Sequence, residues 1–154
     1  MAQLVSYSLM NVNATLSGPG AQISLGYGAA VAKEGITAEM LEEKDGLLVG
    51  ADGSIMHSLR GGNAGRISVR LLKTAPANAA LSIAYNFQRT NASFWGQNIL
   101  MISDVQRGDV VTATNLAFTK FPTVTWAEDG NTLDWVFTGN VLELLGLGTA
   151  DINL

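Results

Sequence analysis

The chain has no cysteine, few charged residues and no long apolar run. Without cysteine, neither a disulfide framework nor a thiolate metal site is available. No uninterrupted apolar stretch approaches the ~20 residues that a membrane-spanning helix needs. Residues 1–6 lack the basic segment and apolar run of a signal peptide. We therefore expect a soluble protein that is made inside a cell and has no membrane partner.

Basic residues are scarce and scattered. The nine Lys and Arg residues never stand next to one another, and the formal net charge is −4. Proteins that grip a phosphate backbone usually gather Lys and Arg on one face. The sequence therefore disfavours tight nucleic-acid binding, while DNA passing nearby without being held remains compatible with it.

The balance of apolar and charged residues points to assembly. Hydrophobic residues make up 47% of the 154 residues and charged residues only 14%, which is richer in apolar residues than an ordinary soluble domain. This length fits one domain, residues 1–154, with a sizeable core. With so few charged residues to cover its surface, the folded chain must expose or hide much apolar surface. We therefore expect an extensive protein–protein contact that hides it.

Short alternating runs between glycine turns predict antiparallel sheet. Val12–Ser17 and Ala21–Leu25 flank Gly18-Pro19-Gly20 and so predict a hairpin. A second hairpin is predicted at the turn of residues 128–131. The other predicted strands are Ile36–Glu43, Leu47–Val49, Ser54–Leu59, Arg66–Lys73, Asn98–Ile102, Asp109–Thr119, Thr123–Trp126 and Thr132–Asn140.

One helix is predicted over about residues 76–88, with Thr74 as N-cap and Pro76 in the first turn. Its apolar stripe is Ala77, Leu81, Ala84 and Gln88, with Ala80 and Phe87 beside them. The predicted fold class is mainly β, a twisted β-sandwich or barrel with this one α-helix packed on its flank.

Reactive side chains do not form a recognisable site. His57 is the only histidine, and Asp52, Ser54 and Ser58 lie too close to it in sequence for a triad, which separated segments normally build. One histidine leaves only carboxylates for a metal. The loop Gly61–Gly65 lacks the lysine and the following helix of a phosphate-binding loop. We predict no catalytic residue, no metal site and no cofactor, and a small enzyme is a weak alternative.

The aromatic residues suit another class, a carbohydrate-binding β module. Phe94, Trp95, Trp126, Trp135 and Phe137 are the residues that a stacking platform would use. Stacking on single-stranded nucleic acid usually comes with a basic groove, which is missing. Core or interface positions are the simpler interpretation, and binding to a glycan column would favour the module.

Several segments, in order along almost the whole chain, resemble one family. They are Met10–Leu16, Gly18–Gly20, Ala51–Leu59, Val69–Thr74, Tyr85–Gln88, Trp95–Asn98, Arg107–Val110 and Trp135–Phe137. Through them the chain resembles the tail tube (inner tube) proteins of contractile-tailed bacteriophages, which are related in shape to type VI secretion tube proteins.

This resemblance implies a structural virion protein rather than an enzyme. It implies homohexameric rings that stack into a hollow tube, in which strands of the protomers close an inner β-barrel and remove exposed sheet edges. The implied partners are further copies of the chain, the tail sheath protein, baseplate and tail terminator proteins, and DNA in transient, non-specific passage during ejection. The implied location is the virion tail, after synthesis in the host bacterial cytoplasm. A terminator or a baseplate hub is the alternative within the tail.

The wall of such a channel should not hold phosphate, because each phosphate neutralised by Lys or Arg adds affinity through counterion release. The strands expected to form it are Ile36–Glu43, Arg66–Lys73, Asp109–Thr119 and Thr132–Asn140. The channel-facing candidates are Thr37, Glu39, Ser68, Arg70, Thr112, Thr114, Asp134 and Thr138. Since a bare Arg70 would hold DNA, we expect it to pair with Glu39.

Residues 42–59 are acidic and rich in glycine at first and more apolar later. Such a segment suits a loop that is mobile in the free subunit and packs on the adjacent ring. The ring-stacking candidates are Glu43, Lys44, Asp45, Leu47, Leu48, Asp52, Ile55 and Met56. Deleting Glu43–Asp52 is expected to leave a folded subunit that cannot lengthen into tubes.

Overall fold

The computed structural model describes residues 6–26, 28 and 31–145. Its elements are η1 (Leu9–Asn11), β1 (Val12–Gly18), β2 (Ala21–Ser24), β3 (Val31–Met40), β4 (Asp45–Val49), β5 (Ile55–Leu59), β6 (Ala64–Leu72), α1 (Pro76–Gln88), β7 (Asn98–Asp104), β8 (Asp109–Phe118) and β9 (Thr132–Leu145). Among these residues, seven strands form one sheet in the order β2-β1-β7-β8-β9-β6-β3, and β4 pairs only with β5. The prediction of a mainly β fold with one α-helix is confirmed.

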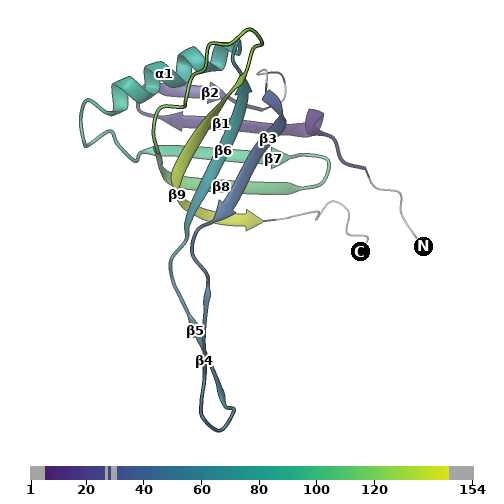
Figure 1. Ribbon diagram of the computed structural model, residues 1–154, viewed down its shortest axis with the longest axis vertical. Helices are drawn as coiled ribbons and strands as arrows, with labels where there is room; N and C mark the ends of the chain where they lie inside the picture. The colour runs from purple at the N-terminus through teal and green to yellow at the C-terminus, as the bar shows by residue number, and fades with distance from the viewer. Residues whose placement is uncertain (1–5, 27, 29–30, 146–154) are drawn as a thin grey trace.

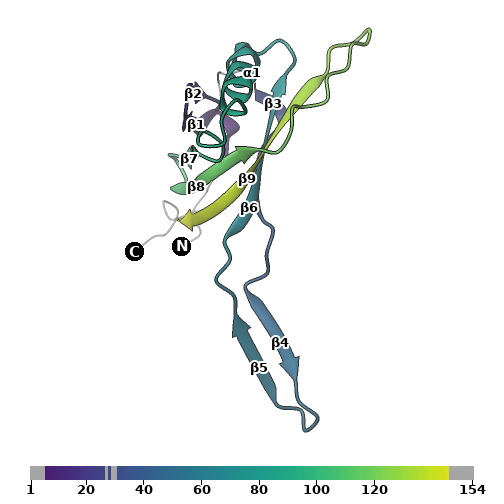
Figure 2. The same ribbon diagram turned by 90° about the vertical axis from the view of Figure 1, so that its left-hand side faces the viewer.

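The seven-stranded sheet folds over on itself into two crossing layers. β3, β6 and β9 lie in front of β1, β2 and β7 (Figure 1), and the turned view separates the two layers (Figure 2). Leu16 and Leu100 from one layer and Ile67, Val69 and Phe137 from the other are fully buried in one cluster. The core therefore lies between the layers, and the opposite sheet faces stay on the surface.

Alternation along the strands places the core residues as predicted. β1 buries every second residue from Val12 to Leu16, and its hairpin with β2 pairs Gly18 with Ala21. Ile67, Val69 and Leu71 of β6 are likewise buried. Period-two burial thus follows directly from the apolar pattern of the sequence.

The apolar face of β9 also lies in the core. Leu133, Trp135 and Phe137 are buried, and the Trp135 ring packs edge-on against Phe118 with ring centroids 5.9 Å apart. Its indole Nε1 donates a hydrogen bond to Asn78 Oδ1 at 3.0 Å. This bond satisfies the indole donor and ties β9 to α1.

The helix has its predicted bounds but not its predicted cap. Ala75, not Thr74, is the N-cap, and no side chain caps the helix there. The residue before a proline favours extended backbone, so the position directly before Pro76 ends the extended segment. The buried stripe is Ala77, Leu81, Ala84 and Gln88, as predicted. Phe87 lies at the edge of this stripe, exposed on one side, and stacks on Phe94 at 5.0 Å between centroids.

A reciprocal amide pair locks the end of α1 to the sheet. Gln88 Nε2 donates to Asn98 Oδ1 at 2.8 Å, and Asn98 Nδ2 donates to Gln88 Oε1 at 2.7 Å. The remaining amide hydrogens go to the carbonyl oxygens of Pro19 and Leu116. Both side chains are fully buried, and all their donors are satisfied. A Cβ at Gly18 would collide with the Asn98 side chain, so only glycine fits there.

The connection from β8 to β9 corrects two predictions. Thr123–Trp126 belongs to no strand, so the turn at residues 128–131 closes no tight hairpin with it, and β9 pairs instead with β8 across the whole connection. Pro122 directly precedes this segment and has no backbone N–H to donate to a neighbouring strand. The segment instead packs near Lys73, whose Nζ bonds the Thr125 carbonyl at 2.7 Å and lies 5.0 Å from the Trp126 ring centroid.

Candidate assembly surfaces

The strands β8, β9, β6 and β3 lie side by side and share a polar outer face. They are the four strands predicted for the channel wall, although β3 ends at Met40 rather than Glu43 because the chain leaves the sheet there. In the register, Thr37 lies opposite Ser68 and Arg70 lies opposite Asp134. The residues on this face that were predicted to line a channel are Thr37, Glu39, Ser68, Arg70, Thr112, Thr114, Asp134 and Thr138, all exposed or half-buried. That the face lines a channel stays a prediction.

The charges of this outer face are paired. Arg66 Nη1 lies 3.5 Å from Glu39 Oε1, and Arg70 Nε lies 3.9 Å from Asp134 Oδ1. Arg70 Nη1 also donates to Thr37 Oγ1 at 3.2 Å. The expected pairing of Arg70 with Glu39 is therefore wrong. The register explains the correction, because Arg66 stands directly opposite Glu39 and Arg70 directly opposite Asp134.

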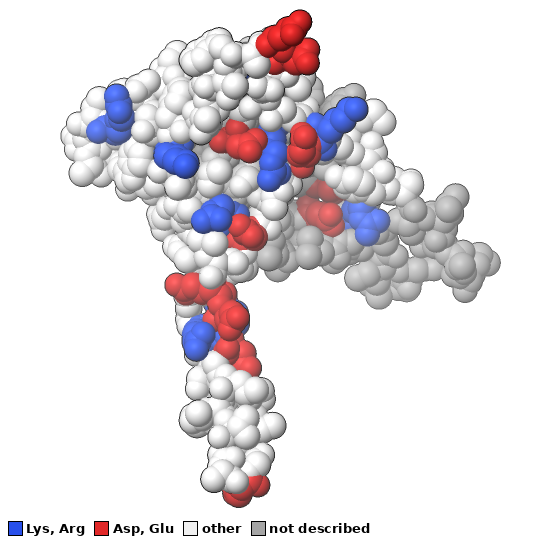
Figure 3. All heavy atoms as spheres, in the orientation of Figure 1, with Lys and Arg blue, Asp and Glu red and all other residues white. Residues whose placement is uncertain are grey.

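Three further residues belong to this outer face and were not chosen from the sequence. Val136 stands opposite Ser68, and Arg66 stands opposite Thr138. Asn140 faces Thr114 on β8. The sequence could have identified them, because in a strand every second residue lies on the same face, and these residues alternate with the same spacing as Ser68, Arg70, Asp134 and Thr138. Figure 3 shows this side of the body as mostly uncharged, with blue and red groups close together.

The strands β4 and β5 form an arm that projects far from the body (Figures 1 and 2). The strands predicted at Leu47–Val49 and Ser54–Leu59 are confirmed as the two strands of this hairpin, and its mobility in the free subunit stays a prediction. Leu48 and Met56 lie opposite each other on one side, which we call the narrow face because glycine and serine flank the pair. The other side, the broad face, carries Leu47, Val49, Ile55 and Leu59. All six are exposed, Leu59 to 88%.

Polar contacts shape the two ends of the arm. At its base, Lys44 Nζ donates to Gly62 O and Asn63 Oδ1. His57 Nδ1 lies 2.9 Å from Asp45 Oδ2, with both side chains exposed. At its tip, hydrogen bonds from Ser54 lower the pKa of the Asp52 carboxyl.

Reactive chemistry is not concentrated anywhere on the described residues. Over residues 6–26, 28 and 31–145, no cluster of three or more His, Asp and Glu residues suits a metal ion. His57 meets Asp45 on the open surface of the arm. In the described part of the chain, no helix is long and apolar enough to cross a membrane. Trp135 lies in the core, which removes it from any sugar-binding platform.

A mainly β chain with a polar outer face, a projecting apolar arm and no cluster of reactive groups among its described residues has the features expected of a structural protein. Comparison with protein families specifies it further. Residues 4–146 match the family described as Bacteriophage PhiTE tail tube protein. The chain belongs to this family of phage tail tube proteins, so it is a structural component of the virion tail and not an enzyme. The resemblance seen in the sequence is confirmed.

A solved structure has a similar fold. The chain is similar to a protein described as the anti-feeding prophage cap, a tube terminating cap, in a cryo-EM structure. The sequence identity is 11%, the match covers 91% of this chain and 92% of that chain, and the TM-score is 0.52. No curated protein sequence matches the chain.

Proposed function

We propose that this chain is the tail tube subunit of a contractile phage tail. As one domain over residues 1–154, it forms homohexameric rings that stack into a hollow tube, and DNA passes through the lumen during ejection. The subunit is made in the host bacterial cytoplasm. The tube lies inside the tail sheath and is bounded by baseplate and terminator proteins. Membership of the tail tube family supports a tube; the ring size and DNA conduction are our proposals.

The outer face of β8, β9, β6 and β3 carries this proposal. Its two arginines each lie against a carboxylate on the neighbouring strand, so the described side chains of this face add no net positive charge. A wall of this kind gives DNA phosphates little reason to displace counterions and bind. Threonine, serine and asparagine, together with Val136, occupy the other positions named on this face, and none of them is charged. This combination suits a surface along which DNA slides.

The edges of the sheet support ring formation. Among the described strands, β2 and β3 pair on one side only. An unpaired edge strand is a template for pairing with another chain. Pairing between protomers around a ring would cover such edges and close a barrel from several copies. Closure would also hold the polar outer face toward the axis.

The arm supports stacking along the tube. Its apolar side chains contact no core residue and stay exposed in the single chain. Apolar surface of this extent is normally covered by a partner. A head-to-tail contact between unlike surfaces of identical subunits repeats without limit, as a tube requires. We therefore assign the arm to the contact between rings.

Negative-stain electron microscopy of the purified protein tests the proposal. We expect long hollow rods whose rings show sixfold symmetry in averaged end views. Light scattering that shows only monomers at high concentration, together with tail fractions that lack the protein, would contradict it.

A tube terminator is the second candidate function. The solved protein of similar fold is described as a tube terminating cap, and it supplies the specific reason to consider this role. A terminator forms a ring that does not lengthen. Discrete rings without rods, at every protein concentration, would favour the terminator over the tube subunit.

A further inference from the structure

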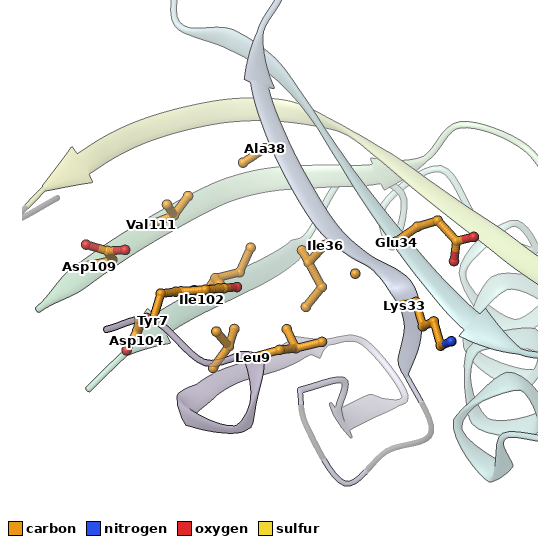
Figure 4. Close-up of a pocket in the computed structure, with 12 residues that line it drawn as sticks. Tyr7, Leu9, Lys33, Glu34, Ile36, Ala38, Ile102, Asp104, Asp109 and Val111 are labelled. Carbon is orange, nitrogen blue, oxygen red and sulfur yellow. The ribbon is translucent and has the colours of Figure 1, made fainter. Parts of the chain in front are cut away.

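A cleft of ≈ 520 Å³ opens between β3 on one side and β7 and β8 on the other, with η1 below them (Figure 4). Its middle is apolar and is lined by Leu9, Val12, Ile36, Ala38, Ile102 and Val111. Lys33 and Glu34 lie at one end, and Asp104 lies at the other (Figure 4). The cleft is therefore an apolar trough with charged groups at both ends.

Asp104 has an incomplete set of hydrogen bonds. Its side chain is only 4% exposed. Oδ1 accepts from the backbone N–H groups of Gln106 and Arg107 at 3.2 and 3.3 Å. Oδ2 is buried and has no hydrogen-bond partner among the described residues. Because a buried carboxylate oxygen without a donor is strongly disfavoured, this end of the cleft calls for a donor from elsewhere.

The narrow face of the arm has the matching order of groups. Leu48 and Met56 stand opposite each other in its middle. Toward the base, the Arg60 guanidinium lies over Gly46, on this same face. Toward the tip stands Asp52, whose Oδ1 accepts a hydrogen bond from the Ser54 backbone N–H. The face thus runs from negative tip through an apolar pair to a positive base.

We propose that the narrow face of one copy's arm docks in the cleft of a copy in the adjacent ring. Leu48 and Met56 enter the apolar middle, and Arg60 donates to Asp104 Oδ2. Asp52 then approaches the end that holds Lys33. This inference rests on the proposed tube, because it names the two surfaces through which rings would join.

A second copy is the occupant for three reasons. The tail tube family makes self-contact the expected interaction. Arm and cleft are different surfaces of one chain, and such heterologous contacts propagate along an axis. In this orientation the Arg60 guanidinium meets the end of the cleft that carries Asp104 and Asp109, and Asp52 meets the end where Lys33 stands beside Glu34. The broad face fits less well, because it is wider and carries the His57–Asp45 pair.

Crosslinking between copies tests the docking. The natural chain has no cysteine, so introduced thiols react without background. We would mix Met56→Cys protein with Ala38→Cys protein, let rods form and oxidise them. We expect a disulfide-linked dimer, because residues 56 and 38 would meet only between chains. Oxidising each variant alone is the control, because it reveals disulfides between two copies of the same introduced cysteine.

The matched control is Ile55→Cys, which sits next to Met56 on the same strand, faces the broad side and is similarly exposed. It should give little dimer with Ala38→Cys. Equal or stronger crosslinking from Ile55→Cys would overturn the choice of face. Rods without any bond from residue 38 to the arm would overturn the docking while leaving the tube intact. Absence of rods from the unmodified protein would instead contradict the proposed function.

The Arg60–Asp104 contact has its own test. Arg60→Gln and Asp104→Asn should each raise the protein concentration needed for rod growth about tenfold, the usual effect of losing a hydrogen bond to a charged group. The double variant should be no worse than either single variant, because both remove one interaction. Thermal unfolding of the free subunit controls for folding. Additive effects, or unchanged rod growth, would show that these groups do not meet.

Discussion

The body and the arm use the same apolar residue types in opposite ways. Leu16, Leu100 and Phe137 are completely buried in the body, whereas Leu48 and Ile55 in the arm are each 61% exposed. Burial of apolar surface stabilises by about 25 cal/mol per Å², and the body obtains this stabilisation when a single chain folds. The arm obtains it only when another molecule covers it. On the proposed stacking of rings through the arm, folding and assembly are encoded in separate segments, and substitutions should separate them.

Removing a core aromatic should have the largest effect. Trp135→Ala deletes a buried ring that packs against Phe118 and Phe121, and it leaves Asn78 without its indole donor. We expect a loss of about 3–5 kcal/mol in the free energy of unfolding, measured by urea denaturation. Trp126→Ala is the control, since that ring is 81% exposed and should change stability by less than ~0.5 kcal/mol. Equal losses for both would contradict the assignment of the core.

Breaking the reciprocal amide pair should have the next largest effect. Gln88→Ala leaves the buried Asn98 amide without its partner, which should cost about 2 kcal/mol in the free energy of unfolding. Asn86→Ala on the same helix is the control, because Asn86 is exposed and bonds only the Ser82 carbonyl. Thermal or urea unfolding compares them. A neutral Gln88→Ala would mean that the pair does not hold the helix.

Changing the arm should reverse this pattern. Deletion of Glu43–Asp52 removes β4 and the tip but no core residue, so the free energy of unfolding should change by roughly 1 kcal/mol or less. Rod growth, in contrast, should stop completely. Electron microscopy and urea denaturation of the same preparation measure the two effects. Normal rods from this deletion would end the assignment of the arm to ring stacking.

The sequence predicted the elements whose burial depends only on the local repeat of a strand or a helix. The alternation of Ile67, Val69 and Leu71 depends only on the pleat of one strand, and the helix stripe only on the helical repeat. The two strands of the arm were predicted in the same way, but their projection from the body was not. The strand predicted at Thr123–Trp126 was wrong, because a composition typical of strands does not ensure that a partner strand lies beside it. That choice is made by the tertiary fold.

The details of the candidate surfaces depended on register, which the sequence does not display. Arg70 forms its ion pair with Asp134 rather than Glu39. Two neighbouring strand pairs fix its position, one of them with an irregularity between Val31 and Ile36. The pairing of Gln88 with Asn98 likewise joins a helix end to a strand start. The cleft near Asp104 arises only after the sheet folds over.

The smallest structural change is predicted to have a purely functional effect. Glu39 and Arg66 are exposed partners at 3.5 Å, and a pair of this kind contributes ~1 kcal/mol at most. Glu39→Lys should therefore leave the subunit folded and the rods normal. It places two positive groups where a neutral pair stood, once in every subunit of the proposed wall. Because such groups bind phosphates through counterion release, genome delivery should slow at least about tenfold.

Two matched variants separate this charge effect from other causes. Glu39→Gln removes the carboxylate without adding a positive charge, so it should slow delivery less than Glu39→Lys. Glu128→Lys makes the same change of charge on the exposed loop before β9 and should leave delivery unaffected. DNA release from particles carrying each variant, followed at two salt concentrations, measures the difference. The Glu39→Lys defect should shrink at high salt, where phosphate contacts weaken. Normal delivery by Glu39→Lys at low salt would show that the outer face of β3 and β6 does not line the path of the DNA.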